Sequence, residues 1–364
     1  MAPGRLLALA AVCFLATSAA IPNTSFADET AAADEAASAD EAASGDDAAE
    51  QAVAAKPTSA KGWTTDLDFL PDGGIVAATA DGLLLRPAAV LRLEMDSDGE
   101  PKKLYEHPAA VWAIAVVDDG KKIASVDYRG NLAIHDLESG DTQLHDKATR
   151  RWAKILLPTP DSKSIVVGNE AGELIVWDLA AGKVSKEHKV DDAILNSAAW
   201  SPTRDRLALA DGSGRVHVLS WPSLSETMST KVGVGGATSV AFFNDETLLV
   251  GSEDRRLYQV TMAKDAEPAV SELIRCNDWV TSIVVDNNQA WAGDLAGRVH
   301  HLSLGKTEVE EIESGIWRLG RANGRWYAAT REHLVVAQVT DVPSSEDPEN
   351  DKAAGEEESA SGNP

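Results

Sequence analysis

Short apolar runs separated by polar turns follow one another through the central part of the chain. The stretch from Ile165 to Asp178 shows the pattern best: an apolar run, a polar turn that contains Gly172, and a second apolar run that ends in Trp177-Asp178. β-Branched residues on both sides of a glycine-containing turn predict an antiparallel hairpin.

This hairpin recurs at intervals of about 42 residues, which is the signature of a repeat architecture. The equivalent turns are centred on Gly82, Gly130, Gly172, Gly214, Arg255, Gly297 and, more weakly, Glu332. Each repeat contains short apolar strands with closely spaced turns, and no stretch has a helical period. Four strands in each of seven repeats predict an all-β fold, a seven-bladed β-propeller of four-stranded blades.

The predicted propeller spans residues 52–340. Its blades are expected near residues 62–108, 109–148, 149–190, 191–233, 234–276, 277–313 and 314–340, the last together with 52–60.

The N-terminal end predicts export. Residues 1–27 contain one positive residue, Arg5, then an apolar run and small residues before Asp28, as in a secretory signal peptide; a second cleavage site follows Ala20. The apolar run is too short for a membrane span, so we expect no membrane insertion after cleavage. The mature protein should be a periplasmic or extracellular monomer.

Both ends of the mature chain are acidic. Residues 28–51 are nearly all Ala, Asp, Glu and Ser, and residues 341–364 are similar, so both are expected to be disordered. These segments hold more than half of the formal net charge of −25, which disfavours nucleic acid as a partner. They are interpreted as solvated tails or, alternatively, as binding segments for a basic partner or divalent ions.

Three segments are similar to the WD40-repeat family: V-W-A-I-A-V-V-D-D-G at 111–120, A-A-W-S-P at 198–202 and G-E-L-I-V-W-D at 172–178. The resemblance covers about residues 60–340 and implies a propeller that serves protein interaction. It also implies that a strand from the N-terminal end completes the last blade, and Val53–Ser59 is the unassigned stretch that is free to do so.

The chain departs from the family's stabilising network of His, Ser/Thr, Asp and Trp. His107, His145 and His188 match the family's histidine, but Arg129, Ala171 and Ser213 stand where the aspartate belongs, so no blade is expected to complete the network. Instead, a short polar residue stands three positions before the turn glycine, where its side chain can bond the backbone two residues on. These residues are Asp127, Asn169, Asp211 and Asp294.

The sequence contains no phosphate loop and no H-E-x-x-H, G-x-S-x-G or C-x-x-C motif. Cys276 is the one cysteine left after signal cleavage. We therefore expect no enzyme, no catalytic residues, no metal site and no cofactor.

Tryptophan and arginine gather at one predicted face. Five repeats place a tryptophan at the beginning of the first strand, which lines the central channel: Trp63, Trp112, Trp152, Trp279 and Trp317. Loops of that face or positions beside the tryptophans carry Arg129, Arg151, Arg255, Arg298 and Arg318. Both residue types are common in binding hot spots, so these ten residues form a candidate partner-binding ring; the alternative is packing between blades. A loop with three leucines, Leu83–Leu85, is a further contact on that face or, alternatively, extends the second strand or covers the seam where the propeller closes.

These features favour an exported, non-enzymatic scaffold that binds other proteins. The alternative is a propeller enzyme or a small-ligand binder, for a sugar or a metal, at the mouth of the channel. The first-strand positions, which offer mainly tryptophan and aliphatic residues, disfavour this alternative.

Overall fold

The computed structural model describes residues 57–58, 63–95, 100–263, 266–303, 306–312, 314–332 and 334–337. The predicted signal peptide (1–27), acidic spacer (28–51) and acidic tail (341–364) lie outside the described residues. The described residues form strands and turns.

The strands form seven four-stranded antiparallel sheets, six of which consist of strands consecutive in the chain. The first three contain β2 (Trp63–Phe69), β3 (Gly74–Ala80), β4 (Ala88–Glu94) and β5 (Lys102–His107); β6 (Val111–Val117), β7 (Lys122–Asp127), β8 (Leu132–Asp136) and β9 (Thr142–His145); and β10 (Ala153–Pro158), β11 (Ser164–Asn169), β12 (Glu173–Asp178) and β13 (Lys183–Lys189). The next three contain β14 (Leu195–Trp200), β15 (Arg206–Asp211), β16 (Arg215–Ser220) and β17 (Glu226–Lys231); β18 (Ala237–Asn244), β19 (Thr247–Ser252), β20 (Arg256–Ala263) and β21 (Ala266–Arg275); and β22 (Val280–Asp286), β23 (Gln289–Asp294), β24 (Arg298–Ser303) and β25 (Lys306–Glu311).

The remaining sheet combines the two ends of the described chain. It contains β26 (Ile316–Ala322), β27 (Arg325–Thr330), β28 (Leu334–Ala337) and the two-residue strand β1 (Pro57–Thr58). In β1, Pro57 lies opposite Val335 and Thr58 opposite Leu334.

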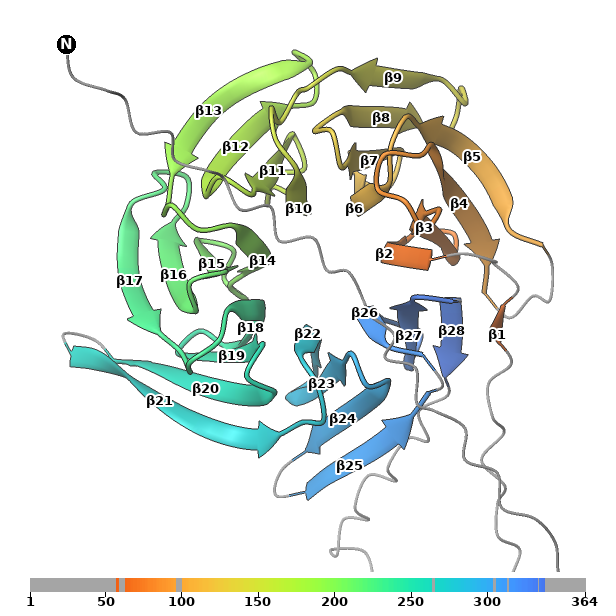
Figure 1. Ribbon diagram of the computed structural model, residues 1–364. Helices are drawn as coiled ribbons and strands as arrows, with labels where there is room; N and C mark the ends of the chain where they lie inside the picture. Colours follow the sequence, from red (N-terminus) through yellow and green to blue (C-terminus); the bar gives the residue numbers. More distant parts are fainter. Residues whose placement is uncertain are drawn as a thin grey trace, which may run out of the picture. The chain divides into compact units, whose positions relative to one another are not determined.

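The sheets are arranged around a common centre, with the first strand of each innermost (Figure 1). First strands of successive sheets contact one another, from β2 and β6 through to β22 and β26, and β26 also contacts β2. Both faces of each sheet are therefore covered, and apolar side chains such as Val167, Ile175 and Leu209 are almost fully buried. The prediction of an all-β propeller with four-stranded blades is confirmed.

The hairpin at residues 165–178 forms as expected. Strands β11 and β12 pair with Ile165 opposite Trp177, and Gly172 occupies the turn with φ +74°. A Cβ atom at Gly172 would lie 2.0 Å from the carbonyl oxygen of Asp191. Glycine is therefore needed here both for its backbone conformation and for the close approach of the next loop.

The polar residues before these turns bond the backbone as predicted. Asp127 Oδ1 accepts hydrogen bonds from the backbone N–H groups of Arg129 and Asn131, both at 2.9 Å. Asn169, Asp211 and Asp294 accept the same pair of bonds in their own blades.

Each first strand also contains a β-bulge near its beginning, which leaves one residue without a pairing partner. We call these residues the bulge ring. They are Thr65, Trp112, Lys154, Asn196, Thr238, Thr281 and Trp317. A bulge redirects the side chain of the extra residue, and all seven of these side chains line one cavity at the centre of the blades.

The bulge ring links neighbouring blades by hydrogen bonds. Four of its side chains donate to the carbonyl oxygen that precedes the bulge residue of the next blade, at distances of 2.5 to 2.9 Å. The donor–acceptor pairs are Thr65–Val111, Asn196–Ala237, Thr238–Val280 and Thr281–Ile316.

The residue after the bulge adds a second set of links. Asp66, Ser197 and Ser282 accept hydrogen bonds from backbone N–H groups of the next first strand at 2.9 to 3.2 Å. Asp66 also forms an ion pair with Arg318, whose Nε lies 3.2 Å from Asp66 Oδ1. This ion pair joins β26 to β2. The inner strands are thus held together by polar contacts as well as by the apolar core.

Candidate functional site at the mouth of the channel

The five candidate tryptophans occupy two different positions in the repeat. Trp112 and Trp317 belong to the bulge ring, whereas Trp63, Trp152 and Trp279 stand two residues before a bulge residue. All five side chains are half-buried. From the sequence alone, all five are predicted at one face. The two positions cannot be told apart there, because a bulge changes the register of the strand pairing without changing the spacing of residues along the chain.

Four of the five form a continuous aromatic cluster. Trp63 contacts Trp112 and Trp317 with ring centroids 5.4 and 5.2 Å apart, and Trp112 contacts Trp152 at 5.2 Å. Rings at these distances are in the range in which edge-to-face and tilted pairs are stabilising. Among the described residues, Trp279 makes no ring contact with this cluster. The tryptophan cluster is therefore Trp63, Trp112, Trp152 and Trp317.

Packing is part of the role of this cluster. The indole N–H groups of Trp63, Trp112 and Trp152 are buried and donate to no described residue. A buried N–H without an acceptor has a free-energy cost, which the packing of the large rings against one another must offset.

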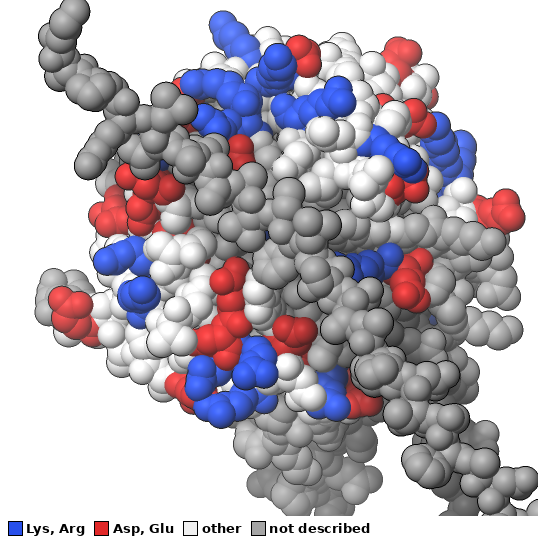
Figure 2. Space-filling view, in the orientation of Figure 1, with Lys and Arg blue, Asp and Glu red and all other residues white. Residues whose placement is uncertain are grey.

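The candidate arginines are only partly brought to the cluster. Arg318 lines the central cavity. Arg151, which precedes Trp152 in the sequence, is exposed and lies 3.8 Å from Glu170. Arg129 and Arg255 are exposed in the turns after their second strands. Arg298 instead forms an ion pair with Glu311 on the outermost strand of its blade. Figure 2 shows both signs of charge dispersed over the visible part of the molecule.

Outside the ten candidates, Arg331 lies over the ring of Trp63, 5.6 Å from its centroid. The loop with Leu83 and Leu85 is not a strand extension. β3 ends at Ala80, and both leucines are more than half exposed in the turn that follows.

A cavity of about 120 Å³ opens at the centre of the bulge ring. Trp112, Trp279 and Trp317 form aromatic walls. The expectation that the channel positions are mainly tryptophan and aliphatic is wrong, because four charged side chains line the cavity. They are Asp66, Lys154, Glu253 and Arg318. Lys154 is the unpaired bulge residue of its strand, whereas Asp66 and Arg318 directly follow the bulge residues Thr65 and Trp317. The sequence does not reveal these positions, because the bulge is visible only in the strand pairing.

Burial changes the acid–base properties of two of these groups. Burial raises the pKa of Asp66 to about 6, although Arg318 and the N–H groups of Ile114 and Leu67 oppose the shift. Burial lowers the pKa of Lys154, and Glu253 opposes that shift. The Lys154 ammonium lies 3.2 Å from Asn196 Oδ1.

Histidine side chains contact several of the aspartates that hold the turns. His107 bonds Ser125 Oγ at 2.7 Å and Asp127 Oδ2 at 3.3 Å, all within the protein interior. Three members of the family's network are thus present in this blade, with the aspartate at the end of the second strand instead of position 129. The fourth is absent, because His135 stands where the third-strand tryptophan belongs.

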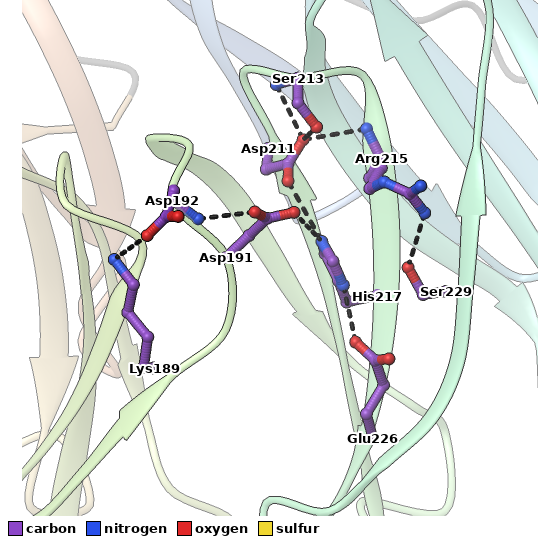
Figure 3. A network of polar contacts seen from close by, with 9 residues as sticks. All are labelled: Lys189, Asp191, Asp192, Asp211, Ser213, Arg215, His217, Glu226 and Ser229. Carbon is purple, nitrogen blue, oxygen red and sulfur yellow. Dashed lines mark hydrogen bonds and ion pairs between the residues drawn. The ribbon is translucent and has the colours of Figure 1, made fainter.

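A second such network surrounds His217 (Figure 3). Its Nε2 lies 3.1 Å from Asp211 and 3.8 Å from Asp191, and its Nδ1 lies 2.8 Å from Glu226. Burial alone lowers the pKa of His217, but the hydrogen bonds with Asp211 and Glu226 outweigh it, so that its pKa is raised. Burial raises the pKa of Asp211, but the hydrogen bonds from His217, the Arg215 N–H and Ser213 together outweigh it and lower the pKa of that carboxyl.

Within the described ranges, two groups have ligand atoms close enough to hold a metal ion. They are Cys276, Asp294 and His300, and Asp191, Asp211 and His217, each with its atoms within 4.8 Å of one another. Asp211 and Asp294 are already engaged. In each, one carboxylate oxygen accepts a hydrogen bond from a turn N–H group and the other lies within hydrogen-bond distance of a histidine nitrogen. Hydrogen bonding therefore accounts for these groups, and burial raises the pKa of the Cys276 thiol to about 12, which disfavours the thiolate that metals bind.

No described helix has the length and apolar character needed to cross a membrane.

No family model matches the chain. Among curated proteins, it is 23% identical over 153 residues to WD repeat-containing protein 55 of Arabidopsis thaliana, covering 42% of each chain. It is 22% identical over 206 residues to WD repeat-containing protein 55 of Homo sapiens, covering 52% of this chain and 53% of that protein. It is also 25% identical over 114 residues to the meiotic recombination protein rec14 of Schizosaccharomyces pombe, covering 31% and 37%. The matched part thus spans about half the length of these relatives, or less.

The His217 network predicts a pH-dependent contribution to stability. A histidine whose pKa is raised by folding stabilises the native state below its unfolded pKa, near 6.5, and this contribution is lost as the pH rises through the folded pKa. We expect His217→Gln to cost about 1 to 2 kcal/mol of unfolding free energy at pH 6 and less at pH 9, measured by urea unfolding.

His135 offers a matched control. Burial lowers its pKa, although Asp136 and Asp141 oppose the shift, so His135→Gln should show the opposite trend between the same two pH values. A cost of His217→Gln that is equal at pH 6 and pH 9 contradicts the assignment.

Proposed function

Because the chain is a WD40-repeat β-propeller, we propose that it is a non-enzymatic scaffold that binds another protein at the mouth of its channel. The observation that carries this proposal is the tryptophan cluster, whose half-buried rings meet at the end of the channel. Large aromatic side chains bury much area at low entropic cost when a partner covers them. The exposed Arg129, Arg151 and Arg255 lie in turns of the same end and extend the surface.

Packing and binding are compatible in this cluster. The contacts among the four rings hold them in fixed positions, and rigid aromatic side chains lose little conformational freedom when a partner docks. Trp279, which lies apart from the cluster and lines the cavity, is the tryptophan whose role depends least on packing.

A small-ligand binder remains the second candidate, since the cavity contains Asp66, Lys154, Glu253 and Arg318. Its size decides against most ligands. Ligand pockets commonly measure about 300 to 1,000 Å³, whereas this cavity holds about 120 Å³. It has room for a side chain or a small polar group, which agrees better with a protein partner than with a sugar.

The scaffold is tested by affinity purification from the native cells, with the co-eluting protein identified and its affinity then measured. We expect Trp279→Ala to weaken that complex about tenfold or more while the melting temperature is unchanged. Leu144→Ala, an exposed apolar residue of the outermost strand β9, should leave the affinity intact. Equal affinities of wild type and Trp279→Ala would show that the partner binds elsewhere.

We propose that the propeller has seven blades and that the strand at the N-terminal end completes the last one. The pairing of β1 with β28, the contact of β26 with β2 and the Arg318–Asp66 ion pair support this arrangement. Replacing residues 57 and 58 by glycine should lower the unfolding free energy by about 1 to 2 kcal/mol, because glycine has a lower preference for the strand conformation than the two residues it replaces. Unchanged urea unfolding curves would exclude a closing role for this strand.

We also propose that the protein is exported, acts as a monomer and does not bind nucleic acid. The supporting observations are the signal-peptide pattern of residues 1–27 and the net charge of −25. Intact-mass measurement of the protein from the envelope fraction should give a chain that begins at Asp28. A chain that retains Met1 and fractionates with the cytoplasm would refute export.

A further inference from the structure

We propose that the central cavity is a subsite for the side-chain carboxylate of an acidic peptide segment, bound between Lys154 and Arg318. This inference rests on the proposed function and specifies the chemistry of the partner. Both cations line the same cavity, one on β10 and the other on β26.

The two cations retain open hydrogen-bond donors. Lys154 has three ammonium protons, and among the described residues it donates to one acceptor, Asn196 Oδ1 at 3.2 Å. The ring of Trp152 lies 4.9 Å from the same nitrogen. Among the described residues, no carboxylate lies within ion-pair distance of Lys154. A half-buried ammonium with donors to spare is stabilised by an incoming anion.

Arg318 is held in position but keeps hydrogen-bond donors for a ligand. Its Nε contacts Asp66 Oδ1 at 3.2 Å, which fixes the guanidinium at the cavity wall. Its side chain is 43% exposed, and Asp66 is its one ion-pair partner among the described residues, with the Asp68 carboxylate a more distant source of attraction. Guanidinium N–H groups are suited to a carboxylate because they present donors in a planar fork.

The two carboxylates in the cavity are already engaged by the protein itself. Asp66 accepts N–H groups from Leu67 and Ile114 in addition to Arg318. Glu253 accepts the N–H of Gly236 at 3.1 Å. The cavity thus contains two carboxylates with protein donors and two cations with free donors, so an added carboxylate meets attraction that is not already satisfied.

The walls and the size favour a carboxylate carried on a short apolar stem. Trp112, Trp279 and Trp317 flank the cations, and a space of about 120 Å³ admits one side chain and no larger ligand. The aspartates and glutamates of a peptide, separated by alanines, present such groups. The chain's own segment A-D-E-A-A-S-A-D-E-A-A-S at residues 33–44 has this composition, so the carboxylate can come from the same chain or from a partner.

The test uses a synthetic peptide with the sequence of residues 33–44 and a matched peptide in which Asn and Gln replace Asp and Glu. Each is titrated into the mature chain (28–364), and binding is measured by calorimetry and by tryptophan fluorescence, since three tryptophans line the cavity. We expect the acidic peptide to bind and the neutral peptide to bind at least tenfold more weakly. We expect Lys154→Met to weaken the acidic peptide about tenfold, Lys154→Arg to retain binding, and Lys183→Met, on the exposed strand β13, to have no effect.

A second protein separates the two sources of the carboxylate. In a mature chain whose residues 28–50 carry Asn and Gln in place of Asp and Glu, tighter peptide binding would assign the site to the chain's own spacer. Unchanged affinity would assign it to a partner. If the acidic and neutral peptides bind alike, or if Lys154→Met and Lys183→Met bind alike, the subsite does not exist. That result leaves the scaffold itself to be judged by the Trp279→Ala measurement.

Discussion

The β-bulge near the beginning of every first strand is the constraint on which the rest of the structure depends. In a regular strand, side chains alternate between the two faces of the blade, and none of them points along the sheet toward the channel. One unpaired residue per blade breaks this alternation. Its side chain reaches the next blade, as Thr281 reaches the carbonyl of Ile316, and the following residue accepts an N–H from the same strand. The contacts that join the blades and the residues that line the cavity therefore arise from one backbone irregularity.

The parts of this fold that the sequence predicts are those determined locally. The turn at Gly172 requires φ +74° and no Cβ, so glycine recurs at the repeat period and reveals the propeller. The turn bonds of Asp127 and Asn169 join neighbours in sequence and were equally predictable. The channel lining was not, because a bulge adds one residue without altering the apolar pattern. Lys154 reads as an ordinary polar position until the pairing of β10 with β11 shows that it is skipped.

The same difference between local and non-local contacts explains why the turn aspartates were predicted and their histidine partners were not all predicted. The aspartates that hold the turns can be found from their distance to glycine, but their histidine partners come from different strands in different blades. His107 ends the outermost strand of the preceding sheet, whereas His217 belongs to the third strand of its own. A motif that expects the histidine before the first strand finds His107 but misses His217. The electrostatic result is similar in each: a buried carboxylate kept ionised by a ring nitrogen and by backbone N–H groups.

The bulge ring has a consequence for how such a protein can change over time. Its seven positions share one backbone geometry, yet they carry threonine, tryptophan, lysine and asparagine. A residue at one of them can be exchanged without disturbing the strand pairing that supports it, since the position has no partner in the ladder. Variation can therefore alter the polarity and the size of the opening one blade at a time, although an exchange of Thr65, Asn196, Thr238 or Thr281 also removes a hydrogen bond to the next blade.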